Sequence, residues 1–174
     1  MNWQDIPGRL FREEGEALRA LAAVRRVLEI GSLFGRSIVC LAQVAAVVHA
    51  VDPHRPGNTD WCDEFRGRDS LQELRNNLWT AGVLHKVTLH ICTVAELWLP
   101  AAPIFDLAFV DGSHAYRDVR LDLAFAEKAI APNGIIACHD YDRGGPRKAV
   151  DEFCALHHRS LELVRSLAIL RPVP

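Results

Sequence analysis

The sequence lacks several features that would place it in a specialised class of protein. Its five cysteines are odd in number and contain no C-x-x-C pair, which predicts reduced, mostly buried thiols and a cytoplasmic location. It also lacks an excess of charge of one sign, because the net charge is −2 and the pI is near 6.4. Since no basic field attracts phosphates, we expect no nucleic-acid partner.

Long apolar runs are missing as well. The longest nearly apolar stretch, residues 40–51, is interrupted by Gln43 and His49 and is too short to span a bilayer. Residues 1–10 include Asp5 and Pro7 and have no apolar core, so we expect no signal peptide. These absences predict a protein without membrane association.

The composition that remains is that of an ordinary globular chain. Apolar residues make up 49% and charged residues 24% of the 174 residues, a balance unlike that of disordered proteins. A chain of this length buries about 70% of its unfolded surface. We expect one domain over residues 1–174, with an N-terminal helical segment at 1–25 and a core at 26–171.

The most informative stretch is a strand-turn-helix pattern. Val27–Ile30 is a short apolar run typical of a buried strand, and Gly31 and Gly35 follow it. Apolar residues then recur at helical spacing, with Ser37 as the expected helix cap. Such a unit opens many nucleotide-binding sheets, because glycine lets the backbone approach a ligand and the helix N-terminus offers free N–H groups. A βαβ turn without a ligand is the alternative.

This turn is not the dinucleotide fingerprint G-x-G-x-x-G, because it reads G-x-x-x-G, which disfavours a nicotinamide cofactor. The next expected strand, residues 47–51, ends at Asp52. An acidic residue about 20 residues after the glycine motif accepts hydrogen bonds from both ribose hydroxyls of a nucleoside. The alternative is an aspartate that caps the turn before Pro53.

The N-terminal segment and two capping motifs predict further helices. Amphipathic spacing indicates a helix over residues 5–26, weakened or divided by Gly15, with a solvated face that includes Glu13 and Glu14. Capping boxes at residues 70–73 and 93–96 indicate the starts of two more. Further helices are expected at 117–130, stopped by Asn133-Gly134, and at 146–157, beginning with Pro146. Further strands are expected at 86–91, 104–110, 135–138, 161–164 and 167–170.

One long polar connection, residues 53–68, interrupts this alternation. It is rich in proline and glycine and contains Trp61 and Phe65. Long loops in compact domains are often functional, so this one is either a lid or substrate wall, or an ordinary surface loop with Trp61 tucked against the core.

Seven strands alternating with helices predict an α/β fold. We expect a single doubly wound, Rossmann-like sheet of seven mostly parallel strands with helices on both faces. Ligands of such sheets bind beyond the carboxyl ends of the strands. The polar residues expected at those ends are Glu29, Asp52, Asp111, His139 and Asp140.

Two motifs carry a resemblance to a known family. Residues 110–116 read V-D-G-S-H-A-Y, and residues 131–142 read A-P-N-G-I-I-A-C-H-D-Y-D. With the E-I-G-x-x-x-G turn, residues 25–155 resemble the class I S-adenosylmethionine (SAM) dependent methyltransferases, in particular the small family of macrolide-sugar O-methyltransferases and cephalosporin-hydroxylase-like proteins. The resemblance implies SAM as cofactor and the strand order 3-2-1-4-5-7-6, with strand 7 antiparallel.

The resemblance also implies roles for individual residues. Cofactor contacts are expected from Glu29, Gly31, Ser32, Gly35, Asp52 and Asp111. The glycine turn would surround the methionine end, Asp52 would bind the ribose, and residues 92–95 would pass the adenine. Asp111 would face either the cofactor amine or a metal ion.

In metal-dependent relatives, acidic residues that end strands 4 and 5 bind magnesium, and the matching positions are Asp111, His139 and Asp140. His139 departs from that pattern, because the metal-binding members carry a carboxylate there. An imidazole favours softer ions such as manganese, iron or zinc, or the site holds no metal. His114 matches a general base in some relatives, and a structural turn histidine is the alternative. Asp111 and His114 are thus the expected catalytic residues.

The leading hypothesis is therefore an O-methyltransferase that acts on a small-molecule hydroxyl, with SAM and with Mg²⁺ or Mn²⁺ as a further cofactor in the metal-assisted form. A SAM-binding domain without transferase activity is one alternative, and a metal-dependent enzyme of another reaction type is the other. The sequence names no acceptor, and it leaves open whether the chain forms a homo-oligomer.

Overall fold

The computed structural model describes residues 1–174 except 56, 58, 60, 61, 99–103 and 174. Its helices are α1 (Arg12–Ala22), α2 (Arg36–Ala42), α3 (Ser70–Thr80), α4 (Tyr116–Ala129) and α5 (Gly144–His157), with 3-10 helices η1 (Trp3–Asp5) and η2 (Leu84–Lys86). Its strands are β1 (Arg26–Ile30), β2 (Val47–Val51), β3 (Val87–His90), β4 (Phe105–Val110), β5 (Ile130–Cys138), β6 (Arg159–Val164) and β7 (Leu167–Pro172).

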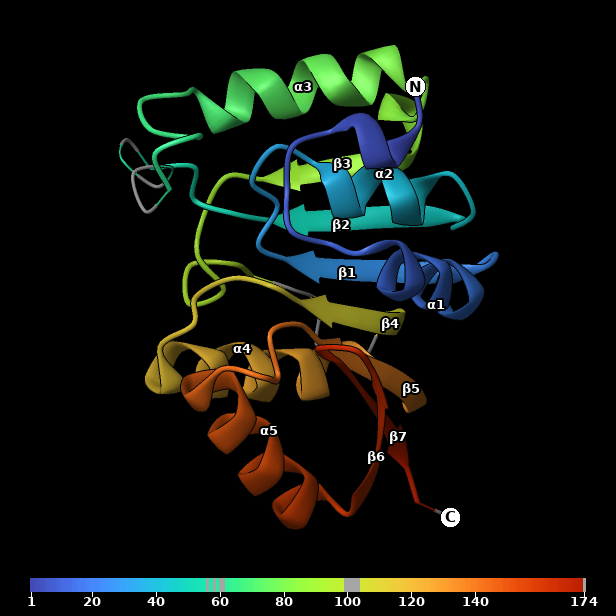
Figure 1. The fold of residues 1–174 in the computed structure, drawn as a ribbon. Coiled ribbons are helices and arrows are strands. Elements are labelled where there is room, and N and C mark those ends of the chain that lie inside the picture. Colours follow the sequence, from blue (N-terminus) through green and yellow to red (C-terminus); the bar gives the residue numbers. More distant parts are fainter. Residues whose placement is uncertain (56, 58, 60–61, 99–103, 174) are drawn as a thin grey trace.

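The strands form one seven-stranded sheet in the order β3-β2-β1-β4-β5-β7-β6 (Figure 1). β1 pairs in parallel with β2 and β4, and β4 pairs in parallel with β5. β7 runs antiparallel to both of its neighbours. The predicted fold class and strand order are confirmed. The order reverses between β1 and β4, and the ends of these strands are where such sheets bind ligands.

Helices cover both faces of the sheet, as its apolar strands require. Leu18 of α1, Ile38 of α2 and Leu74 of α3 belong to one hydrophobic cluster with residues from one face. Val119 of α4 and Phe153 of α5 belong to the cluster on the other face, where these two helices lie against each other (Figure 1). Among the described residues, no helix is long and apolar enough to cross a membrane.

The N-terminal helix is shorter than predicted. The expected helix over residues 5–26 is wrong at both ends, since α1 spans Arg12–Ala22. Gly15 does not divide it. The Trp3 ring lies so close that a Cβ on Gly15 would be 2.4 Å from its nearest ring atom. Gly15 therefore gives Trp3 room against the helix.

Between η1 and α1, residues 7–10 line the cavity at the carboxyl edge of the sheet, and the chain bends at residues 6–9. The Arg36 guanidinium holds it by donating hydrogen bonds to the carbonyls of Gln4, Ile6 and Leu10. The same guanidinium lies over the Trp3 ring, 5.3 Å from its centroid. One side chain of α2 thereby fixes the segment that closes one side of the site.

Two expected helix caps are replaced by neighbouring residues. Gly35, in the left-handed region at φ +87°, is the N-cap of α2 in place of Ser37, which lies inside the helix and donates to Glu29. Asp69 caps α3 in place of Ser70 by accepting a hydrogen bond from the Gln72 N–H. Both helices exist as predicted, but their first turns are fixed differently.

Three expected boundaries are also wrong. The capping-box hydrogen bonds of Thr93 form, yet residues 91–98 contain a turn and no helix. α4 ends at Ala129, and Asn133-Gly134 lie inside β5, because Ile130 already pairs with Phe105 before the register shifts. α5 begins at Gly144, so Pro146 is its third residue.

The long loop at residues 53–68 is described only in part, and Trp61 lies outside the described residues. Pro53 and Arg55 line the cavity at the carboxyl edge. Phe65 is buried and meets the Phe34 ring edge-on, with centroids 5.2 Å apart. The described part thus forms a wall anchored by Phe65, and a lid function stays a prediction.

Candidate active site

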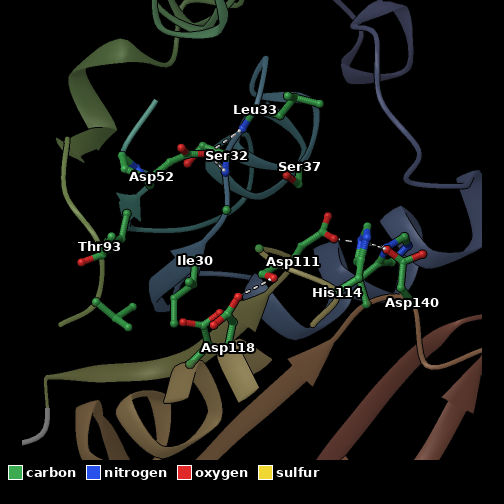
Figure 2. A pocket seen from close by; sticks show the side chains of 18 of the residues that line it. Ile30, Ser32, Leu33, Ser37, Asp52, Thr93, Asp111, His114, Asp118 and Asp140 are labelled. Carbon is green, nitrogen blue, oxygen red and sulfur yellow. Dashed lines mark hydrogen bonds and ion pairs between the residues drawn. The ribbon is translucent and has the colours of Figure 1, made fainter. Parts of the chain in front are cut away.

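A cavity of about 780 Å³ lies at the carboxyl ends of β1, β2, β4 and β5. Figure 2 shows Asp52 and Thr93 on one side of it, His114 and Asp140 on the other, and Asp111 between them. Its wall also includes residues 7–10 of the N-terminal segment and residues 92–95 after β3. The predicted residues Gly31, Ser32, Asp52, Asp111, His114, His139 and Asp140 all line this cavity, whereas Glu29 and Gly35 do not.

The glycine turn is shaped by a close approach of two strand ends. Gly31 has φ +91°, and a Cβ there would lie 2.2 Å from the carbonyl oxygen of Asp111. No L side chain fits that position, because both the backbone angle and the space exclude it. At Gly35 a Cβ would lie 2.4 Å from the Leu74 side chain. Gly35 therefore shapes the turn from the side that packs against α3, away from the cavity.

Asp52 is fixed by the same turn. Its Oδ2 accepts hydrogen bonds from the N–H groups of Ser32 and Leu33, at 2.8 and 3.1 Å, and its Oδ1 accepts one from His54 N–H (Figure 2). The two bonds to Oδ2 use both of its lone pairs, so Oδ1 keeps one free lone pair, and the group lines the cavity. Asp52 therefore stabilises the turn, as the alternative proposes. It also lines the cavity, where it can accept a hydrogen bond from a ligand hydroxyl.

Two polar groups near the turn lack a partner among the residues that the structure describes. Ser32 Oγ lines the cavity and makes no hydrogen bond, and neither does Glu29 Oε2. Glu29 is fully buried behind Ser37, so burial raises its pKa well above the ordinary value, and Asp111 and Asp52 add to that rise. Unsatisfied buried groups of this kind are usual where a ligand completes the hydrogen bonding.

The three residues predicted as metal ligands converge at the other end of the cavity. His139 Nδ1 lies 3.4 Å from Asp111 Oδ1 and 3.5 Å from Asp140 Oδ2. One ligand atom from each residue lies within 4.8 Å of the others. Three lone-pair donors that face one another need a cation between them, which is either a proton on His139 or a metal ion.

Sequence analysis did not identify the residue that orients His139. Glu14 of α1 was expected on a solvated helix face, but it is fully buried, and its Oε2 lies 3.0 Å from His139 Nε2. Its other oxygen accepts from Ser166 N–H and Oγ, at 3.0 and 2.7 Å. Burial raises the pKa of Glu14, but these donors outweigh it and lower the pKa to about 2.

His139 is correspondingly a buried cation. Burial lowers its pKa, but Asp111, Asp140 and Glu14 outweigh that effect and raise the pKa to about 12. A proton therefore fills the place between the carboxylates. A metal ion that binds there has to displace this proton from Nδ1 while Glu14 keeps the one on Nε2.

His114 forms a second histidine–carboxylate pair. Its Nε2 lies 2.6 Å from Asp140 Oδ2, and its Nδ1 lies 3.3 Å from Arg143 Nη1 (Figure 2). Because Arg143 is a donor only, Nδ1 accepts, and the proton of the neutral ring sits on Nε2, where Asp140 receives it. Asp140 adopts φ +57° and also pairs with Arg143. Two charged side chains, Asp140 and Arg143, thus hold the His114 ring. A structural turn histidine alone does not account for these side-chain contacts.

With this geometry established, comparison with known proteins decides the family. Residues 28–141 match a methyltransferase domain family, which is more than half of the chain. The chain belongs to this family. No curated protein sequence matches the methyltransferase.

Solved structures share the fold of this methyltransferase. The O-methyltransferase TomG from Streptomyces achromogenes, involved in tomaymycin synthesis and solved with SAM, gives a TM-score of 0.69 at 20% identity, covering 95% of this chain and 82% of that one. The O-methyltransferase from Bacillus cereus in complex with SAH gives 0.66 at 17% identity, with coverages of 97% and 85%. The tRNA (m1A58) methyltransferase TrmI from Aquifex aeolicus gives 0.69 at 16% identity, with coverages of 97% and 71%. At such identities the likeness shows the fold and leaves the acceptor open.

Proposed function

We propose that this methyltransferase transfers the methyl group of SAM to a hydroxyl of a small molecule. The observation that carries the proposal is the His114–Asp140 pair, which lines the same cavity as Asp52 but at its opposite side. A nucleoside held by Asp52 would share this cavity with the pair. The family, and neighbours solved with SAM or SAH, support the cofactor.

SAM supplies the methyl group and its own leaving group when it is bound. The chain has to bind it, orient the acceptor and remove the hydroxyl proton. Asp52 accepts a ribose hydroxyl through the one lone pair on Oδ1 that its backbone contacts leave free. Ser32 Oγ, buried and unpartnered among the described residues, offers a hydrogen bond to the methionine end.

His114 is the general base of the proposal. Its ring donates Nε2–H to Asp140, so Nδ1 carries the lone pair that takes the proton once Arg143 no longer donates to it. Arg143 now donates to that nitrogen, but its side chain is 51% exposed and leaves readily when an acceptor hydroxyl arrives. Asp140 then stabilises the imidazolium, as the carboxylate of a catalytic triad does.

A metal-assisted form is the second candidate, with Mg²⁺ or Mn²⁺ bound by Asp111, His139 and Asp140. The convergence of three ligand atoms supports it. A metal at this place would lower the pKa of a bound hydroxyl. Because the ion competes with the His139 proton, we expect metal affinity to rise with pH.

The test is calorimetric titration of SAM and SAH into metal-stripped protein, repeated with Mg²⁺ and with Mn²⁺. We expect both nucleosides to bind, and Asp52→Ala to weaken them by about 10- to 100-fold, because a charge-assisted hydrogen bond is lost. Turnover on a panel of small hydroxyl compounds is then measured through SAH release. His114→Asn is expected to lower turnover by about 10²–10⁴-fold with SAH affinity unchanged, and His85→Asn, an exposed histidine, is the control.

Each outcome separates the alternatives. Absence of nucleoside binding would overturn the cofactor and leave only the fold. Binding without turnover on the panel would favour a non-catalytic SAM-binding domain, and metal binding without nucleoside binding would favour another reaction type. A cytoplasmic location and a homo-oligomer stay predictions; light scattering in solution tests the second.

A further inference from the structure

The cavity contains one buried carboxyl group that the proposed chemistry does not use. Asp122 lies on α4, lines the cavity and is only 8% exposed. It forms no hydrogen bond or ion pair with any residue in the described part of the chain. This residue lines the cavity, so a ligand bound there can supply the hydrogen-bond partner that the described residues do not.

The position of this carboxyl within the cavity is well defined. A Cβ on Gly112 would lie 3.3 Å from Asp122 Oδ2 and 3.8 Å from Ile30 Cγ2. The carboxyl therefore sits between α4 and the ends of β1 and β4, on the floor of the cavity. Figure 2 shows Ile30 and Asp118, one helical turn before Asp122, on the side away from His114 and Asp140.

The surroundings of Asp122 suit a flat heterocycle. Ile30, Val51, Cys92 and Val94 belong to one hydrophobic cluster and all line the cavity. A nucleoside whose ribose is held at Asp52, with its reactive end toward Asp111, has only this apolar side left for its base. Apolar walls with one polar group are typical of sites that orient a ring by a single hydrogen bond.

The neighbouring carboxylate does not share this arrangement. Asp118 is exposed, and its Oδ2 accepts the hydroxyl of Ser113 at 2.8 Å. Burial, and to a lesser extent the negative charge of Asp118, raise the pKa of Asp122 to about 7. On this face of α4, Asp118 therefore has a hydrogen-bond partner within the protein, whereas Asp122 is available to a ligand.

We propose that Asp122 recognises the amino edge of the cofactor's adenine by accepting a hydrogen bond from its exocyclic amine. The proposal rests on SAM as the cofactor. It assigns to α4 the discrimination between adenine and its 6-oxo counterpart, hypoxanthine, which presents an acceptor where adenine presents a donor. A site built around a hydrogen bond rejects analogues that cannot make it far more strongly than an apolar pocket does.

The test compares SAH with S-inosylhomocysteine, in which an oxygen replaces the amine. Calorimetric titrations at pH 8.5 keep Asp122 of the free protein ionised, so that it acts only as an acceptor. We expect the wild-type protein to prefer SAH by at least about tenfold. Asp122→Asn, whose amide either accepts from the amine or donates to the oxygen, is expected to reduce this ratio to about threefold or less.

Asp118→Asn is the matched control, since it removes a carboxylate one turn away on the same helix and should keep the wild-type ratio. A wild-type ratio below about threefold, or a ratio that survives Asp122→Asn, would overturn the assignment. The wild-type comparison stands by itself if the Asn variant fails to fold. If neither nucleoside binds, the cofactor proposal fails together with the inference, whereas binding without discrimination defeats the inference alone.

Discussion

The two ends of the cavity are built in different ways. At the cofactor end, backbone groups set the shape, since the turn at Gly31 touches the Asp111 carbonyl and Asp52 is held by the N–H groups of that turn. At the opposite end, charged side chains set it, and Glu14 reaches His139 from 125 residues away in the sequence. A backbone-built site follows from local sequence, whereas a charge-built site depends on partners that only the fold brings together.

Two buried carboxyls show the same contrast. Burial raises the pKa of both Glu14 and Asp122. Donors from His139 and Ser166 reverse the effect at Glu14 and bring its pKa to about 2, while Asp122 has no donor among the described residues and reaches about 7. The partners of a buried acid, more than its depth, decide its charge at neutral pH.

The largest effect is expected from breaking the charged end. Glu14→Ala leaves His139 and the Ser166 N–H buried without their acceptor, so we expect the free energy of unfolding to fall by about 3–5 kcal/mol. Urea denaturation at pH 7 measures it. Glu13→Ala is the control, because this neighbour is 59% exposed and forms a surface ion pair with Arg165, and it should change stability by less than about 1 kcal/mol. Equal effects of the two variants would contradict the role given to Glu14.

Removing the unpartnered carboxyl is expected to act in the opposite direction. The pKa of Asp122 is raised from 3.8 to about 7 on folding, so its favourable contribution is complete below pH 3.8 and is lost as the pH rises through 7. Asp122→Asn carries no such dependence. We therefore expect the variant to gain roughly 2–4 kcal/mol over wild type at pH 8 and little at pH 4, measured by urea denaturation at both values. Asp118→Asn should show no comparable gain, and a loss of stability in Asp122→Asn at pH 8 would disprove this account.

Comparing Gly31 with Gly82 separates the effect of the close contact with the Asp111 carbonyl from that of the backbone angle. Gly31→Ala combines a left-handed backbone with a contact on the Asp111 carbonyl, so we expect a loss of about 2–3 kcal/mol and weaker SAH binding. Gly82→Ala has a similar φ of +70° but open space around the added Cβ, and should cost only about 1 kcal/mol. Thermal unfolding and calorimetry measure the two effects. Equal losses would show that backbone angle alone matters at Gly31.

The smallest effect is expected at the exposed arginine of the charged end. Arg143→Ala removes ion pairs from a side chain that is 51% exposed, so stability should change by less than about 1 kcal/mol. Arg159→Ala is the contrast, because that side chain is 4% exposed and binds Glu127 and the Gly134 carbonyl; it should cost at least about 2 kcal/mol. Chemical denaturation of both variants checks the difference. An Arg143→Ala loss as large as that of Arg159→Ala would mean that surface charge also holds the site.

The sheet could be predicted from sequence because its strands are short apolar runs that end at polar residues. Those endings placed Asp52, Asp111, His139 and Asp140 at one edge, and the structure brings all four to the cavity. The strand order came from the resemblance, since periodicity alone does not fix which strands are neighbours. Asn133-Gly134 misled the prediction, because a register shift allows β5 to begin before them.

The residues that sequence analysis missed have partners far away in the chain. Glu14 stands among Glu13 and Glu16 and shows the pattern of a solvated helix face, so nothing local distinguishes it. Asp122 likewise follows Asp118 at helical spacing, and only the fold reveals that one is buried and the other exposed. Ser37 was expected to cap α2, but its hydroxyl donates a hydrogen bond to the buried carboxyl of Glu29 on β1.

The contacts of Glu14 have a consequence for the order in which the chain matures during its synthesis. α1 emerges from the ribosome well before His139 and Ser166, which follow Glu14 by 125 and 152 residues. Until then the carboxylate of Glu14 has to stay in water, because burying it alone is too costly. The docking of Glu14 against the sheet therefore has to wait until β5 and the turn before β7 have been made.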